Sequence, residues 1–295
     1  MVRLKIQHLT IYRYASKVSL GPHRLLLRPC ETRDLKLISF NIEMSPQAKI
    51  IWSHDVSGNS IANAEISLLT DYLSIHSHSI IELTAATWPV FETAASAMNY
   101  PFLYSDNDWA DLGALLHPQF EDPENQLANW IEGFIMQRPT DTLSLLMDIS
   151  NGISSQISYK SREAEGTQDP TETLNNASGS CRDFAVLFAE AARTLGFGAR
   201  IVSGYLYNPD ESYIGSAGSG ATHAWVEIYV PGAGWIPFDP TNRTVGSSNL
   251  IPVAVGRDIR QIAPVTGSFH GTDRDFIDMS VKVTVEKETE DALRP

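Results

Sequence analysis

The chain places a cysteine at the point where a turn should give way to a helix. Cys181 follows the small residues 178–180, and an apolar repeat with helical spacing runs from Phe184 to Leu195. We expect a helix that begins at Cys181, where free backbone N–H groups and the helix dipole favour an anion, and that ends before Gly196. A thiol in that position has a lowered pKa and can act as a nucleophile. The alternative interpretation is a small, buried, apolar cysteine, which is the state of most free cysteines.

A nucleophilic thiol needs a neighbouring base, and a predicted hairpin supplies a candidate. Residues 222–242 contain two alternating runs on either side of a glycine-rich turn. If the apolar faces of the two strands coincide, Val226 lies opposite Phe238, which requires a three- or five-residue loop or a bulge. In that register His223 and Asp239 lie diagonally on the other face, close enough for long side chains to meet.

These residues can fill the three roles of a thiol enzyme. Cys181 would attack a carbonyl carbon, His223 would hold the thiolate and later protonate the leaving amine, and Asp239 would orient the imidazole. The backbone N–H of Cys181 is a natural donor to an oxyanion, and Tyr159 or Trp225 could supply the second donor. No metal or organic cofactor is required. Taken singly, His223 could instead be a structural histidine of a sheet, and Asp239, which precedes a proline, a turn residue.

The elements that must position this site follow a long strand-rich region. Residues 1–88 contain short alternating runs separated by turn signals, which predicts a β-sandwich. His76 and His78 would share one face of a strand there. They could form half of a metal site, or they could be ordinary surface histidines, because the sequence shows no third ligand.

The remaining elements are predicted from periodicity and turn residues. We expect three regions: a sandwich over residues 1–90, a connecting helical and irregular segment over 91–140, and a core with a C-terminal strand over 141–295. Ser180 and Asp183 have the spacing of a capping box at the start of the central helix. Within these regions the patterns predict helices at 123–135 and 141–149, a polar surface loop at 160–176, a strand at 199–205 and a glycine-rich loop near the site entrance at 208–220.

Bulk properties narrow the class of partner. The chain has 295 residues, a formal net charge of −13 and no dense basic run, which argues against nucleic acid and anionic membranes as partners. Its two cysteines, Cys30 and Cys181, are too few for a secreted disulfide scaffold. The first residues carry no apolar core and no apolar run is long enough to span a bilayer, so we expect no signal peptide and a cytoplasmic location. The oligomeric state stays open.

Several segments resemble the transglutaminase-like core of bacterial proteins, in the order and at the spacing of that family. They surround the candidate cysteine, histidine and aspartate, and further segments resemble the tail and the N-terminal β domain of the same bacterial group. The segments are Gly-Ser-Cys-Arg-Asp-Phe-Ala, Arg-Ile-Val-Ser-Gly-Tyr, Thr-His-Ala-Trp-Val-Glu-Ile-Tyr-Val-Pro-Gly-Ala-Gly-Trp and Phe-Asp-Pro-Thr-Asn, with residues 254–258, 263–267 and 19–24.

The resemblance implies an α+β, papain-like core preceded by an N-terminal β-sandwich, with a catalytic triad at Cys181, His223 and Asp239. It implies thiol-dependent chemistry on a protein or peptide amide through a thioester. Hydrolysis is our first expectation, because bacterial members of this organisation are commonly described as candidate cysteine proteases. A transamidating crosslinker, and a binding module that keeps the fold without catalysis, are the alternatives. Nothing in the chain resembles the calcium-binding apparatus of animal transglutaminases.

Overall fold

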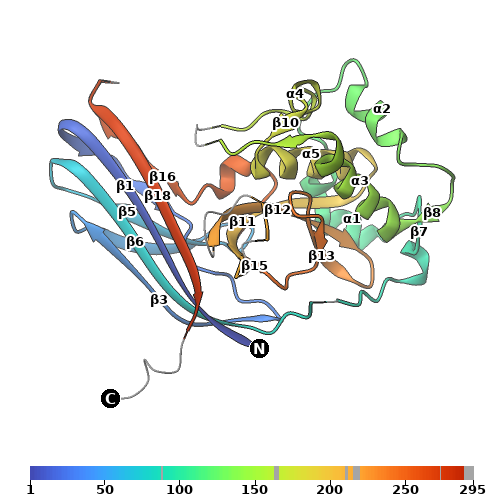
Figure 1. Ribbon diagram of the computed structural model, residues 1–295, viewed down its shortest axis with the longest axis horizontal. Helices are drawn as coiled ribbons and strands as arrows, with labels where there is room; N and C mark the ends of the chain where they lie inside the picture. Colours follow the sequence, from blue (N-terminus) through green and yellow to red (C-terminus); the bar gives the residue numbers. More distant parts are fainter. Residues whose placement is uncertain (88, 163–165, 210–211, 215–219, 273, 289–295) are drawn as a thin grey trace.

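Two packed halves form the molecule, one built of strands and the other of a sheet covered by helices (Figure 1). The computed structural model describes the chain except residues 88, 163–165, 210–211, 215–219, 273 and 289–295. The strand-rich half and the helical half correspond to the predicted sandwich and the predicted α+β core. Among the described residues, no helix combines the length and the apolarity that crossing a membrane requires.

The strand-rich half is a sandwich of two antiparallel sheets. One sheet runs in the order β17-β1-β6-β3, with β18 pairing β1, and the other runs β16-β2-β5-β4. Alternating residues of both sheets meet in one apolar cluster, which contains Leu25 and Ala62 of one sheet and Leu73 and Ile75 of the other. The strands of the N-terminal region are β1 (Val2–Leu20), β2 (His23–Leu25), β3 (Leu35–Ser45), β4 (Lys49–His54), β5 (Ser60–Glu65) and β6 (Thr70–Leu83).

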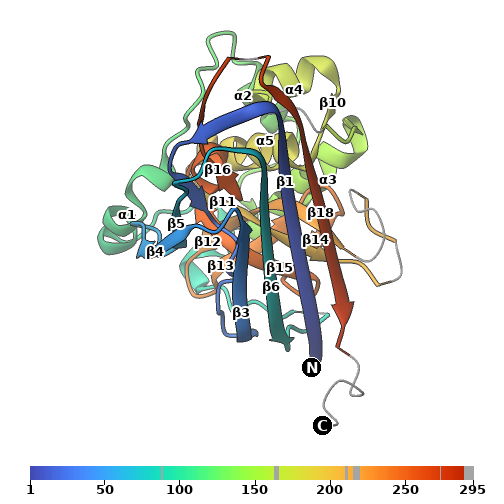
Figure 2. The same cartoon turned by 90° about the vertical axis from the view of Figure 1, so that its left-hand side faces the viewer.

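Strands from the far end of the chain complete both of these sheets. β18 pairs with β1 along most of its length, from Leu4 opposite Lys287 to Tyr14 opposite Phe276. The first and last strands of the chain therefore lie side by side, as Figure 2 shows. The three strands concerned are β16 (Val265–Thr266), β17 (Phe269–His270) and β18 (Phe276–Lys287).

The helical half contains a five-stranded sheet in the order β14-β13-β12-β11-β15. The helix α5 (Cys181–Thr194) packs its apolar face on the two central strands of that sheet. Phe184, Leu187 and Phe188 of α5 are fully buried there, so the sheet fixes the direction in which the helix start points. The strands are β11 (Gly198–Tyr207), β12 (Gly220–Val230), β13 (Gly234–Asp239), β14 (Thr244–Val245) and β15 (Leu250–Gly256).

The predicted helices are present with corrected ends. The first predicted helix is α2, which covers only seven residues, and the second is α3, which extends to Gln156 and is capped by the side chain of Asp141. The predicted loop at 160–176 is wrong in its second half, because Asp169 caps a short helix there and Pro170 occupies its first turn. The predicted loop at 208–220 lies partly outside the described residues. The other elements are η1 (Ala95–Ala97), β7 (Asn99–Tyr100), α1 (Asp106–Leu112), η2 (Gly113–Leu116), α2 (Gln126–Glu132), β8 (Thr140–Asp141), α3 (Thr142–Gln156), β9 (Ser158–Tyr159), α4 (Pro170–Asn176), β10 (Ser178–Gly179) and η3 (Ile259–Ile262).

Apolar and polar contacts join the two halves. Leu4 and Ile6 of β1 belong to the same buried cluster as the core of the helical half. On the same strand, His8 is buried and its Nδ1 atom lies 3.1 Å from the hydroxyl of Tyr205. The side chain of Asn59 accepts the N–H of Val255 at 2.8 Å and donates to its carbonyl at 2.7 Å, as a neighbouring strand would. The sandwich is thus a fixed support for the sheet that carries the candidate site.

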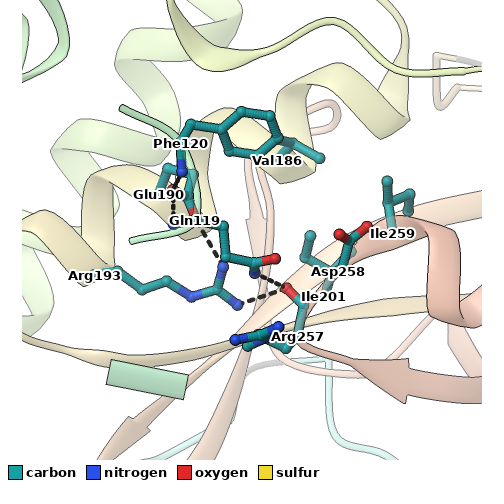
Figure 3. Close-up of a pocket in the computed structure, with 9 residues that line it drawn as sticks. All are labelled: Gln119, Phe120, Val186, Glu190, Arg193, Ile201, Arg257, Asp258 and Ile259. Carbon is teal, nitrogen blue, oxygen red and sulfur yellow. Dashed lines mark hydrogen bonds and ion pairs between the residues drawn. The ribbon is translucent and has the colours of Figure 1, made fainter. Parts of the chain in front are cut away.

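A buried ion pair within α5 also binds the segment between η2 and α2. Glu190 and Arg193 are each almost fully buried, and their side chains meet at 2.6 Å (Figure 3). The other carboxylate oxygen of Glu190 accepts the N–H groups of Gln119 and Phe120 at 2.7 and 3.1 Å. Arg193 also donates to the carbonyl of Arg257 at 2.8 Å. The pair therefore satisfies backbone groups of the covering segment as well as its own charges.

Candidate active site

The hairpin that carries the histidine and the aspartate has the predicted register. Val226 lies opposite Phe238 and Ile228 opposite Ile236, and the pairing closes around a three-residue loop at 231–233. These apolar residues face α5 and are buried. Their packing therefore fixes the pairing of the two strands, and with it the position of the polar residues on the other face.

His223 and Asp239 are in contact. The Nε2 atom of His223 lies 2.8 Å from Oδ2 of Asp239, and both side chains are buried. Burial by itself lowers the pKa of His223, but the charge and hydrogen bond of Asp239, together with the Cys181 thiol, outweigh burial and raise that pKa to about 10. Burial likewise opposes ionisation of Asp239, yet the charge of His223 and donors from Asn242 hold the pKa of that carboxyl below its usual value. The pair is therefore an imidazolium beside a carboxylate.

Cys181 lies at the other side of the imidazole. Its thiol lies close enough to His223 and to the backbone N–H of Ala224 for both groups to favour the thiolate. Burial alone raises the pKa of the Cys181 thiol, and these two contacts with the charge of His223 outweigh it, so that the pKa is lowered. Since Nε2 of His223 is engaged by Asp239, and Nδ1 is buried without a hydrogen-bond partner in the described structure, Nδ1 is the ring nitrogen that remains for the thiol. Cys181 as a residue is partly exposed, whereas His223 and Asp239 are buried.

The end of a strand ladder makes room for the thiol. β13 pairs with β12 only over Val226–Val230, so Ala224 lies beyond the last paired residue of β12 on that side. On its other side β12 continues to pair with β11, where Ala224 lies opposite Ser203. The N–H of Ala224 can therefore serve the sulfur of Cys181 while the strand stays held by β11.

A buried carboxylate fixes the turn before Cys181. One oxygen of Asp183 accepts the backbone N–H of Ser180 at 2.7 Å and its hydroxyl at 2.8 Å, in the predicted capping box. The other oxygen accepts the guanidinium of Arg162 at 2.7 Å and the N–H of Gln168 at 2.8 Å. Asp183 therefore connects the turn at Ser180 to the earlier segment that contains Arg162 and Gln168. The carboxylate is fully buried, and the guanidinium of Arg162 balances its charge.

The two residues considered for the second oxyanion donor lie in different surroundings. Tyr159 is partly exposed and lies on β9, which runs parallel to the strand that leads into Cys181. Burial and the charge of Cys181 raise the pKa of Tyr159 to about 12, so its hydroxyl keeps its proton. Trp225 is buried and stacks on His223 with ring centroids 6.2 Å apart. Its indole N–H is buried beside apolar side chains and has no partner in the described structure.

Asn242 completes the surroundings of the carboxylate and was missed by the sequence reasoning. Its amide N–H donates to Oδ2 of Asp239 at 2.8 Å, and its amide oxygen accepts the backbone N–H of Ile214 at 2.8 Å. It thus connects Asp239 to the segment between β11 and β12. The available signal was the sequence Asp239-Pro240-Thr241-Asn242, because an aspartate before such a turn commonly accepts N–H groups two and three residues later.

The paired histidines of the sandwich lie away from this site, on β6 of the strand-rich half. Their ring centroids are 3.8 Å apart. Glu43 of the neighbouring strand β3 joins His76 and His78, with the ligand atoms of all three within 4.8 Å of one another. The third ligand that the sequence did not reveal is therefore present.

Comparison with known proteins assigns the two halves to known types. Residues 130–240 match the transglutaminase-like superfamily, and residues 4–82 match the bacterial transglutaminase-like N-terminal region. An uncharacterised protein of Mycobacterium leprae is 24% identical over 284 residues, which cover 96% of this chain and 99% of that protein. A protein-glutamine gamma-glutamyltransferase of Pseudomonas aeruginosa is 37% identical over 81 residues, which cover 26% of this chain and 12% of that enzyme.

A solved structure has the same fold over nearly the whole chain. It is the 1.9 Å crystal structure of a protein of Cytophaga hutchinsonii described as a "putative cysteine protease". The two structures superpose with a TM-score of 0.73 at 19% sequence identity, covering 97% of this chain and 92% of that one. The arrangement of a sandwich before an α+β core is therefore shared by both proteins.

Proposed function

We propose that this chain, which belongs to the transglutaminase-like superfamily, is a thiol enzyme that cleaves an amide through a thioester on Cys181. The observation that carries the proposal is a series in which Cys181 lies beside His223, and His223 is hydrogen-bonded to Asp239. In this series the nucleophile is partly exposed and the two groups that activate it are buried. Cys181 thus lies nearer the surface than the two charged groups that favour its thiolate.

The proposed reaction begins from the thiolate and imidazolium forms. The sulfur of Cys181 attacks the carbonyl carbon of the amide, and the electron pair of the carbonyl bond moves to its oxygen. The backbone N–H of Cys181, in the first turn of α5, is the expected donor to that oxyanion, and the Tyr159 hydroxyl is the candidate for the second donor. When the carbon–nitrogen bond breaks, Nδ1 of His223 gives its proton to the leaving amine, which leaves a thioester and a neutral imidazole.

The second half of the proposed cycle restores the enzyme. His223, now neutral, takes a proton from a water molecule whose oxygen attacks the thioester carbon. The carbon–sulfur bond then breaks, a carboxylic acid leaves, and the proton on His223 again faces a Cys181 thiolate. Asp239 stabilises the imidazolium throughout without taking the proton. A primary amine in place of water would give transamidation by the same steps, and this is the second candidate reaction.

Peptide cleavage is the direct test of this proposal. The full chain is incubated with a peptide library whose members carry either internal amides or glutamine side chains, and products are read by mass spectrometry. Hydrolysis predicts new carboxylates, and transamidation predicts incorporation of an added labelled amine. Cys181→Ala should remove both products while the circular dichroism spectrum stays that of the wild type. Undiminished turnover by Cys181→Ala would refute the proposal.

A further inference from the structure

One face of the strand-rich half carries a group of metal-ligating side chains that the proposed reaction does not use. The sheet concerned presents β3, β6, β1 and β18 side by side (Figure 2). Residues 75, 77 and 79 of β6 are buried on its inner face, so His76 and His78 project from the outer face. Both histidines are partly exposed, and β3 is paired only with β6 in the described sheet.

Glu43 reaches the same spot from the neighbouring strand. It lies directly opposite His76 in the β3–β6 ladder, and Asn41 lies opposite His78. The ligand atoms of Glu43, His76 and His78 all fall within 4.8 Å of one another. Within the described residues this is the one such group of three histidine, cysteine or acidic side chains. Two histidines two residues apart on a strand, with a third ligand across the ladder, bring their donors together because the sheet holds them in register.

The donor set fits a zinc-type cation. Imidazole nitrogens and one carboxylate bind zinc with bonds of about 2.0–2.1 Å, which places tetrahedral donors roughly 3.4 Å apart. Contraction from the separations in this structure requires only small rotations of side chains, and the Glu43 side chain is exposed. Three protein ligands leave one tetrahedral position, which a water molecule would fill at this exposed face.

A further side chain supports the carboxylate. The amide N–H of Asn41 donates to Oε1 of Glu43 at 3.1 Å, which leaves the other carboxylate oxygen for a cation. Hydrogen bonds of this kind orient metal ligands and are part of most protein metal sites. The group thus includes one orienting contact in addition to its three donors.

We propose that Glu43, His76 and His78 bind one divalent cation of the zinc type, which fastens the edge strand β3 to β6. The site is separate from the thiol chemistry, because the inner side of the same sheet, where His8 meets Tyr205, lies between it and the helical half. A cation that binds only the folded sheet stabilises it, by an amount that grows with the cation concentration relative to the dissociation constant.

Zinc titration of the full chain tests the proposal. The Cys181→Ala variant is used throughout, because a thiol beside an imidazole and a carboxylate can itself bind zinc. After removal of metals with a chelator, isothermal calorimetry should find one zinc ion per chain, and the melting temperature should rise with zinc. His76→Ala, His78→Ala and Glu43→Gln, each added to Cys181→Ala, should weaken zinc binding by at least about 10-fold. Loss of a residue that merely orients a ligand already costs about that much affinity, and these residues are the ligands themselves.

Two further variants make the result specific. Asn41→Ala should weaken zinc binding by about 10-fold or more, as loss of an orienting partner does, without changing the stoichiometry. His117→Ala removes a histidine whose ring contacts Trp109 in the helical half, and it should leave affinity and stoichiometry unchanged. Absence of zinc binding by the Cys181→Ala chain, or equal binding after His76→Ala and His78→Ala, would overturn the proposal whatever the outcome for amide cleavage.

Discussion

The imidazole of His223 is bound to Asp239 through Nε2 at 2.8 Å, so that only Nδ1 remains to serve Cys181. This arrangement fixes which ring nitrogen carries the transferable proton. It also couples three charges in one line, because the carboxylate raises the pKa of the imidazole and the imidazolium lowers the pKa of the thiol. Each of the two outer residues can therefore be probed through its effect on the other.

Asp239→Asn should remove the electrostatic coupling between Asp239, His223 and Cys181. The amide keeps a hydrogen bond to Nε2 but removes the charge that contributes most to the raised pKa of His223. The imidazolium should then be lost at a lower pH, and the rate of amide cleavage should fall by up to about 10⁴-fold, the loss found when the carboxylate of a comparable triad is replaced. The pH dependence of kcat/KM checks this, with Asp71→Asn on the exposed face of β6 as the control. An unchanged pH profile would contradict the proposed coupling.

Alkylation by iodoacetamide should distinguish the two cysteines. The pKa of Cys181 is lowered, so its thiolate is present below the ordinary thiol value of about 8.5 and should react at neutral pH. Burial raises the pKa of Cys30 to about 11, and its thiol donates to the carbonyl of Val253, so it should react only in alkali. Mass spectrometry after labelling between pH 5 and 10 locates each adduct.

The alkaline end of the same titration provides a second check. The His223 imidazolium should lose its proton near pH 10, because its pKa is raised, and the thiolate then loses its counter-charge. Cys30→Ala should leave the neutral labelling intact, and Cys181→Ala should remove it. Labelling of both cysteines in parallel, with a single midpoint above pH 8.5, would speak against a nucleophilic Cys181.

Asn242→Ala should slow the reaction while Cys181, His223 and Asp239 all remain in place. The variant removes a hydrogen bond to a charged carboxylate, which contributes about 1.5–3 kcal/mol, so we expect kcat to fall about 10- to 100-fold. The pH profile should move as well, because donors from Asn242 help to lower the pKa of Asp239. Asn249→Ala is the matched control, since its amide contacts Tyr213 and not the carboxylate. A change in KM alone would assign Asn242 to substrate binding instead.

Breaking the Glu190–Arg193 pair should destabilise the protein strongly. Arg193→Met leaves the carboxylate of Glu190 buried without its charge partner, which costs about 3–5 kcal/mol of unfolding free energy. Urea unfolding measures this loss, and the double variant Glu190→Gln, Arg193→Met should lose less than the sum of the single variants. Glu132→Gln breaks an exposed ion pair with Arg138 and should change the unfolding free energy little. Equal losses of unfolding free energy from the buried and the exposed pair would show that burial does not determine how much an ion pair contributes to stability.

The sequence predicts the parts of the site that local patterns encode. The helix at Cys181 follows from a cap, an apolar repeat and Gly196, which adopts a φ of +87° just beyond the last turn. The register of His223 and Asp239 follows because apolar residues of the same strands must face one core. In both cases a functional residue is positioned by neighbours a few places away in the chain.

Contacts between distant segments could not be obtained in this way. Arg162 is hydrogen-bonded to Asp183, Ile214 is hydrogen-bonded to Asn242, and Glu43 lies opposite His76 in a strand ladder. No periodicity in the sequence predicts these three contacts. The short helix α4 was missed although Asp169 and Pro170 are ordinary start signals, because seven residues give too little apolar repeat to recognise. Two limits thus separate what was predicted from what was not: contacts between segments far apart in the chain, and local features too short to give a recognisable repeat.

The pairing of β1 with β18 bears on how the polypeptide acquires its shape during synthesis. β1 is made about 250 residues before its partner β18, so the sheet they share has one open edge while the intervening chain is being synthesised. The N-terminal half therefore cannot finish assembling ahead of the rest, as early-made domains commonly do. Ribosome-bound chains that stop before residue 276 should accordingly remain open to proteolysis and to chaperones along this edge.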